Sequence, residues 1–154
     1  RRCKADVALD IPQRRSVVVY VGLTELQRTL YKKILLRDHE SFGPHARLTN
    51  IIMQLRKCSN HPYLFPGVEQ KIDGEYVCGE HLVQASSKLV MLDRLLVRLK
   101  RTGHKVLIFS QMTSMLDVLQ DFCSLRNYRH TRLDGSCRGD DRAESISEFE
   151  DPSV

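Results

Sequence analysis

Two short polar runs in the second half of the chain have the residue types that bind phosphate. Ser110-Gln111-Met112-Thr113 and Gly135-Ser136, the latter just before Arg138, each fall between a predicted strand and a predicted helix. At such a turn the first N–H groups of the helix and its positive dipole end suit an anion. Hydroxyl, amide and guanidinium groups can donate to the same phosphate. The predicted phosphate-backbone contacts are Ser110, Gln111, Thr113, Ser136 and Arg138.

A simpler interpretation remains open for single residues in these turns. Thr113 and Ser136 also suit plain helix N-caps, whose side chains bond only to their own helix. Arg142 can add charge at the second turn, or it can pair with Asp134 or Glu144 instead. Two such turns side by side make the phosphate interpretation competitive with the capping one.

The elements that would position these turns form a strand–helix–strand–helix series. Lys105–Phe109 and Tyr128–Leu133 have the apolar or β-branched composition of strands. Helices are predicted from Thr113, with Met115, Leu116, Leu119 and Phe122 inward, and over Arg138–Glu150, with Ala143, Ile146 and Phe149 inward. Phe109 and Leu133 are expected in the core. This order predicts an α/β fold with a parallel sheet, whose ligands approach the carboxyl ends of the strands.

The first half of the chain predicts mainly helices. Ser16–Leu23 is typical of a strand, and Thr24-x-x-Gln27 is a capping box that opens a helix with Leu26, Leu30, Ile34 and Leu35 inward. A second helix is predicted over about residues 48–58, ending before Asn60-His61-Pro62. Residues 67–79 are predicted to form a loop. Ser86-Ser87 then caps a third helix, with leucines inward, that ends at Gly103.

Several other kinds of site are disfavoured by the sequence. The eight glycines are scattered and form no phosphate-binding loop, so the chain encodes no ATP cradle of its own. Cys58-x-x-His61 and Cys78-x-x-His81 have a spacing that zinc could use. However, Cys58 would complete the inward face of a helix, where a cysteine acts as a small apolar residue. We therefore expect no metal and no nucleophilic triad.

Composition and charge set broader limits. The 154 residues contain five unevenly spaced cysteines and no apolar run of the roughly 20 residues needed to cross a bilayer. Reduced thiols, one ordinary domain and no membrane association are expected. Residues 1–60 contain 12 basic and 5 acidic residues, whereas residues 106–154 contain 5 and 9. The basic front half suits a phosphate backbone or simply a solvated helix surface. As an alternative function, the chain would be a non-enzymatic α/β interaction module that binds a protein or an acidic peptide through its basic helices of residues 28–57.

Several segments together resemble one family of proteins. Residues 52–65, IMQLRKCSNHPYLF, are similar to the LRKxxNHPYLF signature of Swi/Snf-type chromatin-remodelling ATPases. Val106–Thr113 resembles helicase motif IV of that family, and Arg132–Phe149 resembles its next block, RxDGsxxxxxRxxxIxxF. Arg1–Val7 is similar to the end of the first ATPase lobe, and Ser86–Leu89 to its SGKL motif, with Ser87 in place of glycine. The pattern is nearest the ISWI and chromodomain-helicase group, and Gly135–Gly139 and Gly79–Leu82 lean towards its amplified-in-liver-cancer type.

The resemblance implies a division of the chain and a role for it. Residues 1–22 would be the junction between the two lobes together with a strand, and residues 23–85 a helical protrusion with a loop insertion. Residues 86–154 would be the first part of a RecA-like helicase C-terminal lobe, cut short before the family's STRAGGxGxN and QxxxRxxRxGQ blocks. The family hydrolyses ATP with Mg²⁺, moves along double-stranded DNA and acts on nucleosomes in the nucleus. Because the Walker lysine and the arginine finger would lie outside this chain, no catalytic residue can be assigned, and the chain alone is expected to be inactive.

Overall fold

The computed structural model describes residues 14–36, 50–69, 71, 74 and 76–151. Its helices follow one another as α1 (Glu25–Leu35), α2 (Ile51–Asn60), a 3₁₀ turn η3 (Pro62–Leu64), α3 (Glu80–Gln84), α4 (Ser87–Arg101), α5 (Thr113–Leu125) and α6 (Gly139–Glu150). The motif at residues 1–7 and the predicted helical position of Leu48 lie outside the described residues. No helix of the described part is long and apolar enough to cross a membrane.

Helix α1 begins at the predicted capping box. Thr24 Oγ1 accepts from the Gln27 amide at 3.1 Å, and Gln27 Oε1 accepts from the Thr24 amide at 3.0 Å. Leu30 and Ile34 are buried as predicted, whereas Leu26 and Leu35 are exposed, so the inward face was placed wrongly for these two. The buried stripe runs through Gln27, Leu30 and Ile34 instead.

Helix α4 ends where the sequence predicts, whereas α2 continues to Asn60, past its predicted end at about residue 58. His61 has an extended backbone, with φ −158° and ψ 132°, because it precedes Pro62. Gly103 adopts a positive φ of +71°, which lets its amide bond to Lys100 O and the His104 amide bond to Leu99 O. These two bonds close the end of α4 in the arrangement that glycine favours after a helix.

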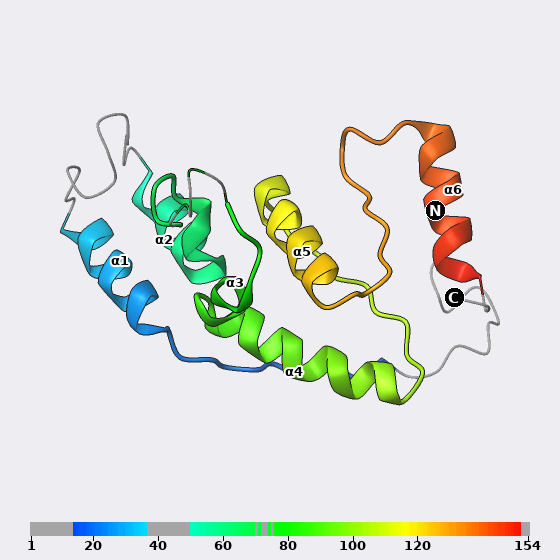
Figure 1. Cartoon of the computed structure of the whole chain (residues 1–154), viewed down its shortest axis with the longest axis horizontal. Coiled ribbons are helices and arrows are strands. Elements are labelled where there is room, and N and C mark those ends of the chain that lie inside the picture. The colour runs from blue at the N-terminus through cyan, green and yellow to red at the C-terminus, as the bar shows by residue number, and fades with distance from the viewer. Residues whose placement is uncertain (1–13, 37–49, 70, 72–73, 75, 152–154) are drawn as a thin grey trace.

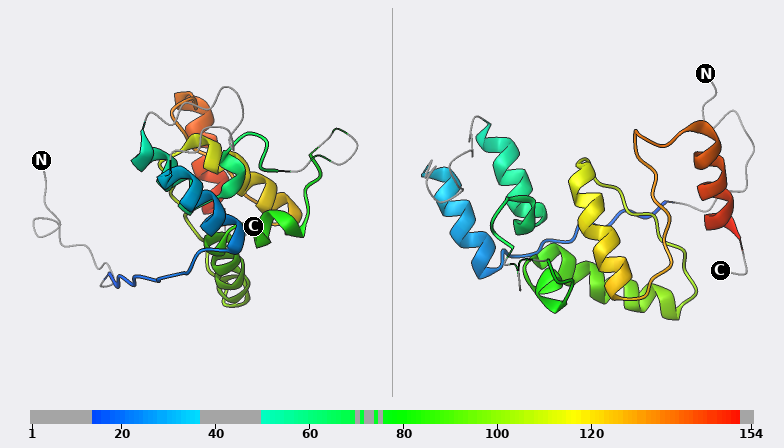
Figure 2. Two further views of the ribbon diagram at one scale, coloured as in Figure 1. Left: turned by 90° about the vertical axis from the view of Figure 1, so that its left-hand side faces the viewer. Right: turned by 45° about the horizontal axis from the view of Figure 1, so that its top comes forward.

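Two hydrophobic clusters form the interior. Leu30, Ile34, Cys58 and Phe65 make one cluster between α1, α2 and the segment after η3. The larger cluster joins α3, α4 and α5 through Leu82, Leu89, Leu96, Met115, Leu119 and Phe122. In Figure 1 the α1–α2 pair lies at one end, α5 lies beside α4 near the middle, and α6 stands at the other end. The right-hand view in Figure 2 shows the same order from another side.

Within the described residues, none of the three predicted strands forms. Residues 16–23, 105–109 and 128–133 run without regular structure: a strand needs a neighbour to take its hydrogen bonds, and no ladder of backbone hydrogen bonds pairs these segments with another that the structure describes. Their apolar side chains stay largely in solvent: Val17 is 83% and Phe109 89% exposed, and Leu133 is also exposed. This structure therefore does not show the predicted strands or their parallel sheet, and the predicted core positions of Phe109 and Leu133 are wrong for it.

Helix α6 forms as predicted but does not join the core. It has no buried residue; Ala143 and Ile146 are exposed and Phe149 is only half-buried, so their predicted inward positions are wrong. Lys105 Nζ holds its C-terminal end by donating to Phe149 O at 2.7 Å and Asp151 O at 2.6 Å. Arg129 adds an exposed ion pair to Glu148. Polar contacts from the preceding segments thus position α6.

Candidate phosphate-binding turns

The first predicted turn lies at the start of α5. Its residue Thr113 does not cap this helix, which was the simpler interpretation of the sequence. Met112, not Thr113, is the N-cap residue, and no side chain caps this helix. Thr113 is the first helical residue and is exposed, as is Gln111. Ser110 Oγ lies 3.2 Å from both the amide nitrogen and the carbonyl oxygen of Met112, so it accepts from one and donates to the other. Ser110 shapes the turn, while Gln111 and Thr113 face solvent.

The second predicted turn is organised around Asp134. Asp134 Oδ1 accepts from the Ser136 amide at 2.8 Å and from the Ser136 hydroxyl at 2.5 Å. Helix α6 begins at Gly139 with Arg138 as its N-cap residue and without a side-chain cap, so the capping role predicted for Ser136 is wrong. The bonds from Ser136, followed by the one from Arg132, hold the pKa of Asp134 below its ordinary range. Asp134 is therefore a fixed anion inside this turn.

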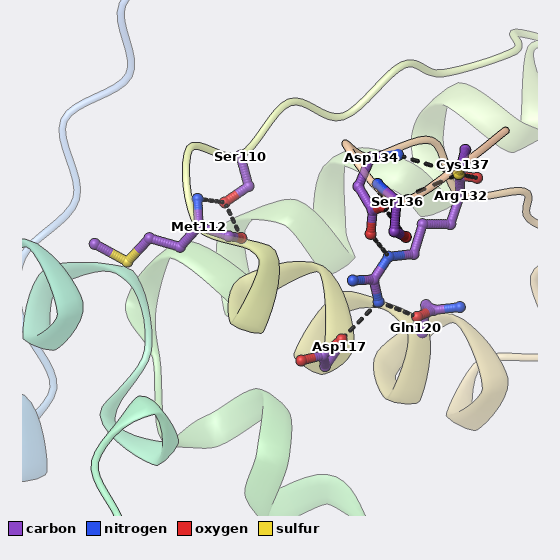
Figure 3. Close-up of polar contacts among 8 residues, drawn as sticks. All are labelled: Ser110, Met112, Asp117, Gln120, Arg132, Asp134, Ser136 and Cys137. Carbon is purple, nitrogen blue, oxygen red and sulfur yellow. Dashed lines mark hydrogen bonds and ion pairs between the residues drawn. The ribbon is translucent and has the colours of Figure 1, made fainter. Parts of the chain in front are cut away.

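Arg132 ties the second turn to α5. Its Nε donates to Asp134 Oδ2 at 2.8 Å, and its Nη1 donates to Asp117 and Gln120 on α5, each at 2.6 Å. Figure 3 shows the guanidinium between the turn and the helix. Hydrogen bonds to Asp117 and Asp134 raise the pKa of Arg132 further, so its charge is permanent. Arg132 already has carboxylate partners and is a positioning residue for the turn.

The structure brings both turns beside the N-terminal half of α5, where Figure 3 shows them together. Of the five predicted contacts, Ser110 is half-buried, whereas Gln111, Thr113, Ser136 and Arg138 are exposed. Arg138 forms no ion pair with any residue that the structure describes. The possible ion pair between Arg142 and Asp134 does not form, and the Asp134 carboxylate pairs with Arg132 instead. Two acidic residues, Asp140 and Asp141, occupy the first turn of α6, one glycine after Arg138.

Sequence reasoning missed the residues that fix the scaffold beneath the turns. Arg126, the C-cap residue of α5, donates through Nε and Nη2 to both oxygens of Asp93 on α4, each at 2.9 Å, and also binds Glu80 on α3. Both carboxylates raise the pKa of Arg126, with the hydrogen bond to Glu80 the larger cause. The partners of Arg126 lie 33 and 46 residues away along the chain, so no local pattern could identify them.

Both residues of the first Cys-x-x-His pair, Cys58 and His61, are buried and bond within the fold. Cys58 is buried, its Sγ donates to Gln27 O at 3.3 Å, and burial raises the pKa of its thiol to about 11. His61 Nδ1 accepts from the Tyr63 amide, so Nε2 carries the proton that it donates to Leu82 O at 2.8 Å. Among the described residues no group of three or more His, Cys, Asp or Glu side chains is arranged to hold a metal ion.

Comparison with known protein families matches most of the chain. The model of the SNF2-related domain matches residues 1–64, and that of the helicase conserved C-terminal domain matches residues 87–154. The second is a family of RecA-like fold.

Similar proteins come from animals, plants and yeast. The chain is 49% identical, over all of its own length and 15% of the relative, to chromodomain-helicase-DNA-binding protein 1-like of Danio rerio. It is 46% identical, over 99% of its length and 15% of the relative, to the human SWI/SNF-related matrix-associated actin-dependent regulator of chromatin subfamily A member 1. It is 44% identical, over 99% of its length and 14% of the relative, to the ISWI chromatin-remodeling complex ATPase ISW1 of Saccharomyces cerevisiae. Two family models in succession, together with these relatives, show that the chain belongs to the SNF2-related family, with the start of a helicase C-terminal domain following the SNF2-related domain.

Proposed function

We propose that the chain forms part of the motor of an ATP-dependent chromatin remodeller that moves along double-stranded DNA. The names of the similar proteins support this, since they include an ATPase of a chromatin-remodelling complex and a helicase described as DNA-binding. The matches favour this role over the alternative of a non-enzymatic interaction module. ATP with Mg²⁺, nucleosomes as partners and a nuclear location belong to the same proposal.

Within that motor, residues 86–154 serve as the first part of the helicase C-terminal lobe, residues 23–85 as a helical protrusion and residues 1–22 as the junction to the first ATPase lobe, which is a partner of this chain. In the complete lobe, Lys105–Phe109 and Tyr128–Leu133 take their places in a RecA-like parallel sheet. The exposure of Leu107 and Phe109 supports this placement, because a buried strand of such a sheet carries apolar side chains on both faces.

The specific role of the second lobe here is contact with the DNA backbone through the two turns beside α5. One observation carries this role: Gln111, Thr113, Ser136 and Arg138 stay exposed while Ser110, Arg132 and Asp134 fix the turns that present them. Exposed amide, hydroxyl and guanidinium donors on a rigid turn suit phosphate oxygens and carry no sequence information. Binding is therefore independent of DNA sequence, weak and dependent on salt.

A salt titration of duplex binding tests this role. Replacing Arg138 with alanine removes one phosphate contact, so the slope of log Kobs against log salt falls by about one unit. The matched control is Arg28→Ala, which removes an exposed arginine from α1 and leaves the slope unchanged. If both variants keep the wild-type slope while melting normally, Arg138 is an ordinary surface residue and the backbone-contact role of this turn is wrong.

A further inference from the structure

Helix α4 exposes a row of arginines on the side that faces away from α5. Arg94, Arg98 and Arg101 are four and three residues apart, so they lie on one face of the helix, and all three are exposed. The opposite face carries Leu89 and Leu96, which pack in the cluster shared with α5. None of the three arginines forms an ion pair with a residue in the described part of the chain.

The charge on this helix is not balanced locally. Asp93 is the only acidic residue between Ser87 and Arg101, and its carboxylate is already bound by Arg126. The dipole at the C-terminal end of α4 favours basic residues in the last turn, which accounts for Arg98 and Arg101. It does not account for Arg94, which lies in the middle of the helix. An anionic partner would satisfy the whole row.

Apolar side chains lie among these arginines. Met91, Leu95 and Val97 are 36%, 46% and 40% exposed, on the same turns as Arg94 and Arg98. We define the arginine face of α4 as these six residues: Met91, Arg94, Leu95, Val97, Arg98 and Arg101. A DNA backbone would satisfy the charges and leave the apolar side chains in water. An acidic protein segment that carries its own apolar side chains would cover both.

We propose that the arginine face of α4 binds an acidic, amphipathic segment of a partner protein. Carboxylates of the segment pair with the guanidinium groups, for which two parallel hydrogen bonds per pair are available. Leucine-like side chains of the segment pack on Met91, Leu95 and Val97. Because α5 and the phosphate-binding turns lie on the other side of α4, as Figure 1 shows for α5, this surface is separate from the proposed DNA contact and can be occupied together with it.

Binding of synthetic peptides to the whole chain, followed by fluorescence anisotropy, tests the proposal. The probe is a peptide of about 15 residues, the length of α4, with leucines three and four residues apart and glutamates elsewhere. The test variant carries R94Q, R98Q and R101Q, and the matched control carries R28Q, K32Q and K33Q on α1. We expect the test variant to bind about tenfold more weakly, the combined loss of three solvent-exposed ion pairs, and the control to bind like the wild type.

Two further probes decide between partners. A peptide with serine in place of each leucine should bind several times more weakly than the first, and Leu95→Ser should reduce the difference between the two peptides. Equal binding of both peptides would overturn the proposal, as would equal loss in the test and control variants. Competition by a duplex of about 20 base pairs for the same three arginines, at equal or better affinity, would assign the face to DNA and also overturn it. Thermal melts of both triple variants show that each remains folded.

Discussion

The side chain of Gln27 connects the start of α1 to the end of α2: its Nε2 donates to the carbonyl oxygen of Cys58 at 2.9 Å. Its Oε1 accepts from the amides of Thr24 at 3.0 Å and Ser87 at 3.3 Å. In the same place Thr24 Oγ1 donates to Ala85 O and Ser86 Oγ donates to Asn60 O. The two hydrophobic clusters are therefore joined by a buried polar junction in which one glutamine bonds to three segments.

Gln27→Ala should lower the free energy of unfolding of the chain, because Gln27 is a buried polar residue. The substitution leaves the Cys58 carbonyl and the Ser87 amide without their partner in a buried setting, which costs about 1–3 kcal/mol for each unsatisfied group. Urea unfolding measures the loss in the free energy of unfolding. Gln84→Ala, an exposed change at the end of α3, should stay within about 0.5 kcal/mol of the wild type. Equal stability of the two variants would show that the junction contributes nothing.

His61 should make stability depend on pH. Burial lowers its pKa below the ordinary value of 6.5, against the opposing effect of the bond to Leu82 O. Below about pH 6.5 the unfolded state therefore binds a proton at His61 that the folded state does not bind. The contribution of His61 to stability is complete above about pH 6.5. It falls as the pH drops below that value, by up to about 1.4 kcal/mol per pH unit. Protonation of Nδ1 would also break its bond to the Tyr63 amide.

The measurement is urea unfolding of the wild type and of His61→Gln between pH 7.5 and pH 5. The decline should be shallower in His61→Gln, and it should be unchanged in the control His130→Gln, whose ring is exposed. Parallel curves for the wild type and His61→Gln would assign the pH dependence to other groups.

The sequence was most informative where the causes of structure are local. The capping box at Thr24 and Gln27 and the end of α4 at Gly103 depend on a few neighbouring residues, and both are confirmed. Helix α2 also ends before Pro62, but two residues later than predicted. Helix α5 also buries Met115, Leu119 and Phe122 as predicted. The helical periodicity of apolar residues and the residues that begin or end helices were enough to predict these features.

Predictions that depended on a distant partner were less successful. Phe109 and Leu133 have the composition of buried strand residues, but no neighbouring strand covers them here. Ser136 was predicted to cap α6, yet its hydroxyl donates to Asp134, a closer acceptor, and α6 begins three residues later. Arg132 and Arg126 each bind groups on other elements, so their roles required the tertiary structure.

Ser136→Ala separates these two roles of the hydroxyl. Because Ser136 is not a cap, the free energy of unfolding should stay within about 0.5 kcal/mol of the wild type, less than the typical cost of about 1 kcal/mol for losing a cap. The pKa of Asp134 should rise, since the Ser136 hydroxyl is the largest cause of its lowering. NMR titration of the Asp134 carboxyl carbon measures the shift, with Ser145→Ala as the control. A loss of helix stability with an unchanged Asp134 pKa would restore the capping role.

The acidic first turn of α6 should oppose DNA binding at the second phosphate-binding turn. Asp140 and Asp141 follow Arg138 after a single glycine, so their charges repel a phosphate held by that arginine, while the same charges favour the N-terminal end of α6. D140N with D141N should therefore tighten duplex binding several-fold at low salt and lower helix stability by about 0.3–1 kcal/mol for each charge. The two effects have opposite signs, so general unfolding cannot imitate the first one.

The matched control, E144Q with E150Q, also removes two negative charges from α6, but farther along the helix. Glu144 and Glu150 lie six and twelve residues after Arg138, and Glu150 is the last residue of α6, where an acidic side chain is unfavourable to the helix dipole. The control should therefore bind DNA more weakly than D140N with D141N and melt at a higher temperature. Salt should abolish the difference in binding, because exposed charges are screened over about 10 Å at 0.1 M. If both double variants tighten binding equally, only net charge matters, and no phosphate lies at the turn before α6.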